Sequence, residues 1–177
     1  RFIMMNMAED APSAIHQPMP AGLEPVDHWI LSKLNNTIKE VTENMDKYEL
    51  GIAVQKVYDF IWDEFCDWYI EMVKPRLYNS DDAVSHEAAL WTLQTVLLNA
   101  LKLLHPYMPF VTEEIYCTLT DEESIMISEW PKFTEEYQFT EDADKVDIIK
   151  DGVRAIRNIR TEMNVPPSKK ASVIIVS

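Results

Sequence analysis

Glycine is scarce in this sequence, with 3 residues among 177. Glycine supplies the positive φ angles and the close backbone approach that phosphate-cradling loops need. The sequence accordingly contains no G-x-G-x-x-G, no P-loop and no G-x-S-x-G elbow, and it also lacks the zinc-binding H-E-x-x-H pattern. The usual sequence signatures of a self-contained enzyme are absent. We therefore expect no catalytic, cofactor-binding or metal-binding residues within these 177 positions.

Cysteines and long apolar runs are also few. Cys66 and Cys117 stand far apart without a C-x-x-C spacing, so we expect two free thiols in a reducing compartment such as the cytoplasm, with a disulfide or a zinc site as the alternative. No apolar run approaches the roughly 18–20 residues that cross a bilayer. The opening "RFIMMNMAED" has one positive charge and no adequate apolar core, so we do not expect it to be a signal peptide. Because the sequence begins with Arg1 rather than methionine and ends directly after an apolar run, we expect it to be a piece of a longer chain.

Five segments carry apolar side chains at the three- and four-residue spacing of amphipathic helices. Residues 1–8 could be the last turns of a further helix. Glu24 can serve as N-cap of the first of the five, with Pro25 at the first helical position. Pro75 and "NSDD" are expected to end the second, and Ser80 or Asp81 to cap the third. The five segments are about 24–46, 51–76, 80–104, 109–119 and 141–163.

Two short apolar stretches favour extended structure instead. "SIMISEWP" at 124–131 is too short for a helix, and "ASVIIV" at 171–176 has the composition of a strand. The sequence therefore predicts a mainly α fold, a bundle of four to five helices with a small β element near the C-terminus.

Charge is unevenly distributed along the chain, whose net charge is −14. Residues 121–147 contain ten acids and two lysines, a net charge of −8, whereas 150–170 contain six cations and two acids, a net charge of +4. Arg154, Arg157 and Arg160 lie at three-residue steps and fan over one side of the last helix. They can hold phosphates as planar, permanently charged forks, or they can pair with acids of neighbouring helices.

Aromatic residues concentrate in "VYDFIWDEFCDWYIEMVKPRLY", which holds seven in 22 positions. A helical wheel places Ile61, Phe65, Trp68 and Met72 on the core side, with Tyr58, Trp62 and Tyr69 offset and Lys74 and Arg76 following. Exposed rings beside cations suit unstacked RNA bases, although a wide buried face fits any single ring as well. The carboxylates of Asp63, Asp67 and Glu71 are interpreted as salt-bridge partners, and His105 as a packing or capping residue.

Several stretches together resemble the bacterial valyl-tRNA synthetase family. They are "DHWILSKLN", "VYDFIWDEFCDWYIEMVKPRLY", "LLHPYMPFVTEEIY", "ISEWP" and "IRNIRTEMNVPPSKKASVII", which occur in the family's order and spacing and span nearly the whole chain. "DHWILSKL" and "HPYMPF" are shared with the wider class I group for valine, isoleucine and leucine. "FCDWYIE" and "MNVPPSKK" are typical of the valine enzymes. "RFIMMN" is similar to the helix that leads out of that family's catalytic domain.

The resemblance implies a helical anticodon-binding domain. In this interpretation residues 1–23 are a connector from a catalytic domain, 24–120 are the anticodon-binding bundle, and 121–177 are an acidic segment, the last helix and a small β appendage. The implied function is binding of the anticodon stem-loop of valine tRNA, in a monomeric ligase whose catalytic domain uses ATP and Mg²⁺. The family's His-Ile-Gly-His and Lys-Met-Ser-Lys-Ser signatures are absent, so these residues are expected to be non-catalytic. The implied partners in the same chain are that catalytic domain, an editing domain and a coiled coil.

The residues expected to bind tRNA are His28, Lys33, Tyr58, Trp62, Arg154, Arg157 and Arg160. Related sequences commonly have arginine where this chain has His28, so any RNA contact there is made differently. Two alternatives remain. One is the same domain of an isoleucyl-tRNA synthetase, against which the Pro-Pro-Ser-Lys-Lys motif argues. The other is a helical protein-interaction scaffold, which the overall acidity favours because acidic surfaces repel RNA and suit basic partners.

Overall fold

The structure is a computed structural model that describes residues 2–6, 13–14, 17–78, 82–166, 168–170, 172 and 174. All regular structure within these residues is helical, so the mainly α prediction is confirmed. The predicted strand at 171–176 falls largely outside the described residues. The short helix α1 (Phe2–Asn6) confirms the expected N-terminal turns over residues 2–6.

Helix α2 (Pro25–Asp46) begins where the capping signals predict. Glu24 is the N-cap, Pro25 occupies the first turn, and the Asp27 carboxylate accepts a hydrogen bond of 2.8 Å from the Glu24 backbone N–H. That reciprocal arrangement satisfies donors that every helix start leaves unpaired. One face of α2 is fully buried through Trp29, Ile30 and Leu34, so the helix forms one layer of the bundle.

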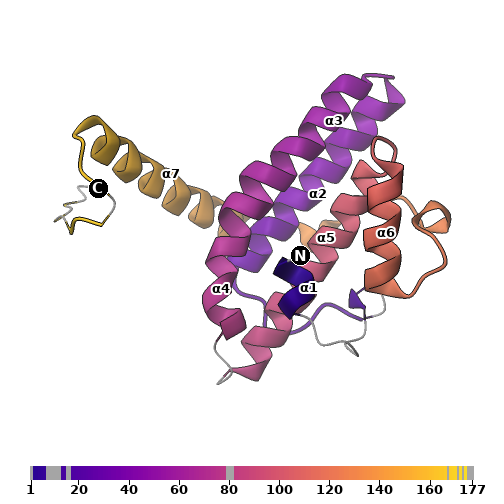
Figure 1. The fold of residues 1–177 in the computed structure, drawn as a ribbon, viewed down its shortest axis with the longest axis horizontal. Coiled ribbons are helices and arrows are strands. Elements are labelled where there is room, and N and C mark those ends of the chain that lie inside the picture. The colour runs from indigo at the N-terminus through magenta and orange to yellow at the C-terminus, as the bar shows by residue number, and fades with distance from the viewer. Residues whose placement is uncertain are drawn as a thin grey trace.

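The second predicted helix is continuous but not uniform. It consists of α3 (Leu50–Asp59), a π-helical stretch η2 (Phe60–Tyr69) and α4 (Ile70–Tyr78), which Figure 1 shows as one ribbon beside α2. Pro75 lies inside α4 and does not end it. The last turn persists because Leu77 is buried and Arg76 is bonded to α2, which outweighs the hydrogen bond that proline cannot donate.

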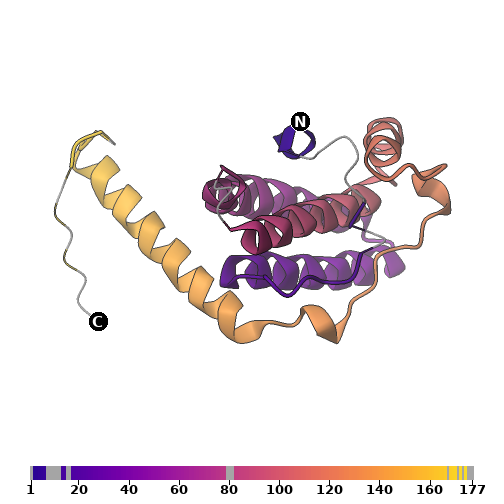
Figure 2. The same cartoon turned by 90° about the horizontal axis from the view of Figure 1, so that it is seen from below.

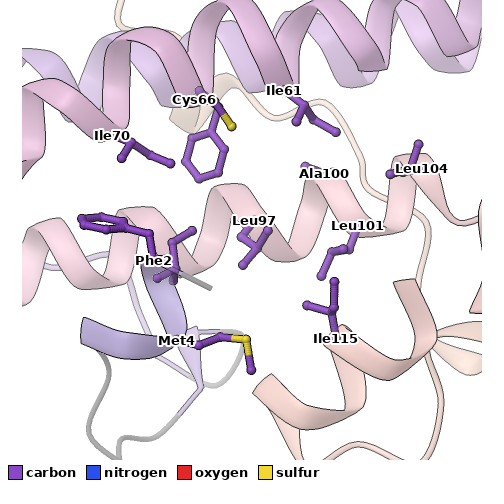
Figure 3. A pocket seen from close by; sticks show the side chains of 12 residues that line it. Phe2, Met4, Ile61, Cys66, Ile70, Leu97, Ala100, Leu101, Leu104 and Ile115 are labelled. Atoms are coloured by element: carbon purple, nitrogen blue, oxygen red, sulfur yellow. The ribbon is translucent and has the colours of Figure 1, made fainter. Parts of the chain in front are cut away.

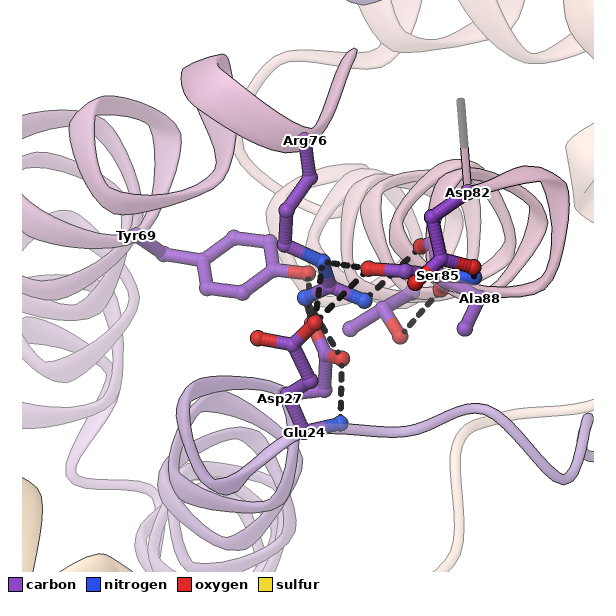
Figure 4. A network of polar contacts seen from close by, with 8 residues as sticks. Glu24, Asp27, Tyr69, Arg76, Asp82, Ser85 and Ala88 are labelled. Carbon is purple, nitrogen blue, oxygen red and sulfur yellow. Dashed lines mark hydrogen bonds and ion pairs between the residues drawn. The ribbon is translucent and has the colours of Figure 1, made fainter. Parts of the chain in front are cut away.

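A buried ionic network joins the start of α2 to the end of this long helix (Figure 4). The Arg76 guanidinium donates to both Asp27 oxygens at 2.9 and 2.8 Å, and the Tyr69 hydroxyl donates to Asp27 at 2.6 Å. Arg76 also donates to the side chain and the backbone oxygen of Ser85, whose hydroxyl donates to Glu24. Burial, and then the Asp27 charge, raise the pKa of Tyr69 well above its usual value, so its hydroxyl stays a donor.

Helix α5 (Ala83–Leu104) forms the centre of the bundle and packs on α2, α3 and α4. Its N-cap is Asp82, whose carboxylate accepts from the Ser85 N–H at 3.0 Å, so the predicted cap at Ser80 or Asp81 was wrong. The distinction is geometric, because only a side chain at the true boundary reaches the third amide of the helix. In Figure 2, α5 lies beside both α2 and the long helix, which also pack against each other.

Helix α6 (Pro109–Thr120) covers the far end of α5, and its Pro109 start agrees with the prediction. His105 ends α5, with its Nδ1 2.7 Å from the Thr112 hydroxyl, which confirms a capping and packing role. An apolar cavity of about 360 Å³ lies between α1, η2, α5 and α6 (Figure 3). Its lining includes Phe2, Met4, Ile61, Cys66, Ala100 and Ile115. Partial burial raises the pKa of the Cys66 thiol.

The segment after α6 was predicted to be extended, and that prediction was wrong for Ile125–Ile127. These residues form the 3₁₀ turn η3, because the Ser124 hydroxyl accepts from the Met126 N–H and Ile125 is buried among α5 and α6 side chains. A second such turn, η4 (Glu135–Tyr137), follows. Residues 130–139 of this segment form hydrogen bonds with α2.

The bonds to α2 come from buried polar side chains. The Asn35 amide donates to the Thr134 carbonyl and accepts from the Thr134 N–H, and Ser32 does the same with Tyr137 and Phe139. Trp130 donates to Thr42 at 2.9 Å. These contacts hold the acidic segment along α2. The segment leads into α7 (Thr140–Glu162), whose bounds match the prediction.

Helix α7 leaves the bundle at an angle, with its second half extending away from the other helices (Figures 1 and 2). Its predicted apolar stripe is therefore buried only at its beginning. Val146 is buried, whereas Ile149, Ile159 and Met163 are exposed. The helix is held to the bundle mainly by polar contacts, which form the site described next.

Candidate nucleic-acid interface

Tyr58 and Trp62 form an exposed aromatic pair on the long helix. Their side chains are 56% and 51% exposed, and their ring centroids lie 6.2 Å apart with the planes tilted by 49°. Rings this exposed add little to the hydrophobic core, and unstacked bases can stack on them. The prediction that these two rings are offset from the core is confirmed.

The same helical wheel placed Tyr69 wrongly. Tyr69 is fully buried, whereas Trp68, expected on the core side, is partly buried and packs against the core. The cause is the π-helical stretch η2, since its turn holds more residues than an α-turn and rotates successive side chains away from positions calculated at α spacing. Trp68 consequently faces α7, as its contacts with α7 cations show.

Three cations of α7 surround the Trp68 ring. Lys150 Nζ lies 5.5 Å from the ring centroid, and the guanidinium carbons of Arg154 and Arg157 lie 5.5 and 5.4 Å from it. Cations are attracted to the negative face of an indole. Sequence reasoning did not place Trp68 beside these cations, because partners 82 to 89 positions away leave no local signal.

Lys150 is the buried member of this cluster, at 2% exposure. Its ammonium group pairs with Glu64 and lies 4.3 Å from the Trp29 ring centroid. Asp147 is a further carboxylate at 3.8 Å. This lysine therefore serves as an internal anchor of α7 and is not a surface phosphate contact.

His28 and Lys33 pair with acids at the start of α7. The His28 Nδ1 lies 2.6 Å from Asp142, and its ring stacks on Phe139 at 4.0 Å. Lys33 lies 2.7 Å from Asp147. The hydrogen bond from His28 lowers the pKa of Asp142. Their expected contact with tRNA remains a prediction, and the geometry gives both residues an intramolecular partner.

Asp147 is the principal acid of this attachment. Its carboxylate accepts from the Trp29 indole at 3.0 Å as well as from Lys33. Burial acts to raise its pKa, but the bonds from Lys33 and Trp29 together with the nearby positive charges lower it. The first half of α7 is thus tied to α2 by charged hydrogen bonds.

The three predicted arginines do not form one uniform row. Arg154 and Arg157 share the Trp68 ring, and Arg154 has an exposed contact of 3.4 Å with Asp151. Arg160 instead donates to the backbone oxygens of Pro166 and Lys169 at 2.7 and 2.6 Å, so it ties the chain that follows the helix. Arg76, which sequence reasoning placed beside the exposed rings, is turned into the buried network and is 11% exposed.

The interpretation of Asp63, Asp67 and Glu71 as salt-bridge partners is confirmed for Glu71 alone. Glu71 pairs with Lys74, whereas Asp63 and Asp67 are exposed and make no ion pair with any described residue. Within the described residues, no group of three or more His, Cys, Asp or Glu side chains is placed to hold a metal ion. No described helix is long and apolar enough to span a membrane. What the geometry offers is an exposed aromatic pair and a cation cluster on an indole.

Comparison with known proteins identifies the family of the domain. Residues 27–175 match the anticodon-binding domain of tRNA ligases. The chain is 51% identical over 175 residues to a valine–tRNA ligase of Clostridium perfringens, a match that covers 98% of this chain and 20% of that protein. It is 47% identical to the enzyme of Clostridium tetani and 44% to that of Carboxydothermus hydrogenoformans, covering 99% and 100% of this chain and again 20% of each relative.

The chain therefore spans about one fifth of the length of these curated relatives. The family match covers all the described helices except α1 and the first two residues of α2. It thus includes Tyr58, Trp62, Trp68 and the α7 arginines. This chain belongs to the family of anticodon-binding domains of tRNA ligases.

Proposed function

We propose that this chain is the anticodon-binding domain of a valine–tRNA ligase. Its role is to bind the anticodon stem-loop of valine tRNA and to position that tRNA for aminoacylation by a catalytic domain outside these 177 residues. The observation that carries the proposal is the exposed Tyr58–Trp62 pair within a domain of the anticodon-binding family. Unstacked anticodon bases can stack on these rings, and cations can hold the backbone.

The chemistry of the parent enzyme is part of the same proposal. Valine activation with ATP and Mg²⁺ belongs to its catalytic domain, because the residues here offer no glycine-rich phosphate loop and no metal-binding group within the described part of the chain. This domain contributes by binding the tRNA at a site remote from the catalytic centre, which orients the acceptor end of the tRNA. We place the enzyme in the cytoplasm as a monomer, with its editing domain and coiled coil in the same chain.

The test is equilibrium binding of anticodon stem-loop RNAs to the 177-residue chain. A valine stem-loop should bind more tightly than an isoleucine stem-loop. Replacing both Tyr58 and Trp62 by alanine should weaken binding of the valine RNA by about tenfold or more, since each lost stack is worth about 1–3 kcal/mol. The control is Phe110→Ala, which removes another open ring, 91% exposed on α6.

Unchanged affinity in the double variant would contradict the proposal that anticodon bases stack on Tyr58 and Trp62. Preference for the isoleucine stem-loop would instead move the domain to the isoleucine enzyme. Binding of basic proteins with no affinity for either RNA would favour the scaffold interpretation.

A further inference from the structure

Cations of α7 contact the aromatic ring of Trp68 on the long helix. Three positive groups of α7 lie within 5.5 Å of one ring centroid. Like charges this close repel, so each needs compensation. Lys150 has Glu64, and Arg154 has an exposed, longer contact with Asp151. Arg157 has no ion pair with any described residue.

The two arginines differ from ordinary surface cations in how much freedom they retain. An arginine side chain in water loses rotamer entropy when a ligand immobilises it. Here the indole already restrains both guanidinium groups. Both residues are exposed, and the one ion pair among the two is the long contact of Arg154 with Asp151. Two preorganised forks one helical turn apart suit an oxyanion that accepts from both.

We propose that Arg154 and Arg157, held on the Trp68 ring, form a binding site for a backbone phosphate of the bound RNA, with Trp68 as the positioning residue. The site rests on the proposed function, since the phosphate belongs to the tRNA. Lys150 supports the site by holding α7 against Glu64 and Trp29, which keeps the two arginines over the Trp68 ring. Arg160 is not part of the site, because its guanidinium is bonded to backbone oxygens.

The direct test measures the affinity of the 177-residue chain for a full valine tRNA transcript over a range of salt concentrations. Replacing both Arg154 and Arg157 by alanine should lower the slope of log K against log salt by about 0.7–0.9 for each phosphate contact that is lost. Lys132→Ala is the matched control, since Lys132 is an exposed cation paired with Glu129 in the acidic segment. That variant should leave the slope unchanged.

The role of Trp68 is tested separately. Trp68→Leu should weaken binding roughly 3- to 10-fold, the worth of a cation–π restraint, whereas Trp68→Phe, which keeps a ring, should restore most of the affinity. In the leucine background, Arg157→Ala should have a smaller effect than in the unchanged chain, because the two residues act together. Far-UV circular dichroism confirms folding. Arg157→Lys keeps the charge and should still lose affinity, because lysine lacks the planar fork.

The possible failures are distinguishable. If the unchanged chain does not bind valine tRNA, the proposed function fails. If the double arginine variant leaves the affinity and the salt slope unchanged, the phosphate site is overturned. If Arg157→Lys binds like the unchanged chain, the requirement for a guanidinium fork is overturned. If the double arginine variant binds less tightly but Trp68→Leu does not, only the positioning role of Trp68 is overturned. Additive effects of Trp68→Leu and Arg157→Ala would overturn that role as well.

Discussion

Arginines of this domain serve two opposite purposes, and their surroundings decide which. Arg76 is buried against a carboxylate that is itself fully buried, so its charge stabilises the junction of three helices. Arg157 lies on the surface over an indole, with its donors open. The side chains are chemically identical. The difference is that a buried charge must be paired and hydrogen-bonded, whereas a surface charge keeps its hydration until a ligand replaces it.

The buried pair gives a prediction at this scale. Arg76→Ala should lower the free energy of unfolding by about 3–5 kcal/mol, because it leaves the Asp27 carboxylate buried without its cation. Urea unfolding followed by circular dichroism measures the change. The control is Lys74→Ala, which breaks the exposed pair with Glu71 on the same helix and should cost at most a few tenths of a kcal/mol. Equal losses in the two variants would contradict the buried network's role.

Single elements of the fold depart from ideal geometry where the site is built. The π-helical stretch η2 lets one helix present Tyr58 and Trp62 to solvent, Phe65 and Tyr69 to the core, and Trp68 to α7. Helix α7 is attached by ion pairs and cation–π contacts, and Val146 is its only buried apolar residue among those described. An element held by charges responds to pH and salt more than one held by apolar packing does.

The attachment of α7 should therefore weaken in acid. The pKa of Asp147 is lowered in the folded protein, so its contribution to stability is fully present above the unfolded value of about 3.9 and is lost as the pH falls through the lower, folded value. Asp147→Asn should cost on the order of 1 kcal/mol at pH 6, a figure discounted for partial exposure. In urea unfolding, the difference in unfolding free energy between Asp147→Asn and the unchanged chain should be smaller at pH 3 than at pH 6. A difference independent of pH would refute the ionic role.

At the scale of the whole molecule, the net charge of −14 conceals a separation of signs. The acidic segment lies along α2, where Ser32 and Asn35 hold it, and the cations of α7 face Trp68 from a helix that leaves the bundle. An acidic total therefore does not exclude an RNA-binding surface, because screening limits each charge to about 8–10 Å in physiological salt.

The apolar cavity yields a prediction at this scale. Ala100 lines it from α5 and is itself buried, so Ala100→Leu should add apolar contacts and raise the free energy of unfolding by about 0.5–2 kcal/mol. Ala89 on the same helix is fully buried and does not line the cavity, so Ala89→Leu should destabilise by about 1–3 kcal/mol through overpacking. Thermal unfolding of the two variants measures both signs. Destabilisation by Ala100→Leu would indicate that the cavity cannot admit a side chain.

The predictable part of the fold and the site followed from local signals. Glu24 and Pro25 indicated the start of α2, Pro109 that of α6, and the apolar spacing gave α7. Tyr58 and Trp62 were correctly expected to be offset from the core. The placement of Tyr69 failed because a helical wheel assumes a constant turn, and η2 does not keep one. The division of the chain at residues 23 and 120 and the tRNA-binding roles of the individual residues stay predictions.

The sequence by itself determined the helices and the family, because both depend on patterns that repeat over a few residues or on motifs read in order. Only the tertiary structure decided which charges meet. Arg76 bonds to Asp27 across 49 positions, and Lys150 pairs with Glu64 across 86. Whether a cation faces a carboxylate, an indole or solvent depends on which distant helix packs beside it. Electrostatic and cation–π energies fall with distance in space and are indifferent to distance along the chain.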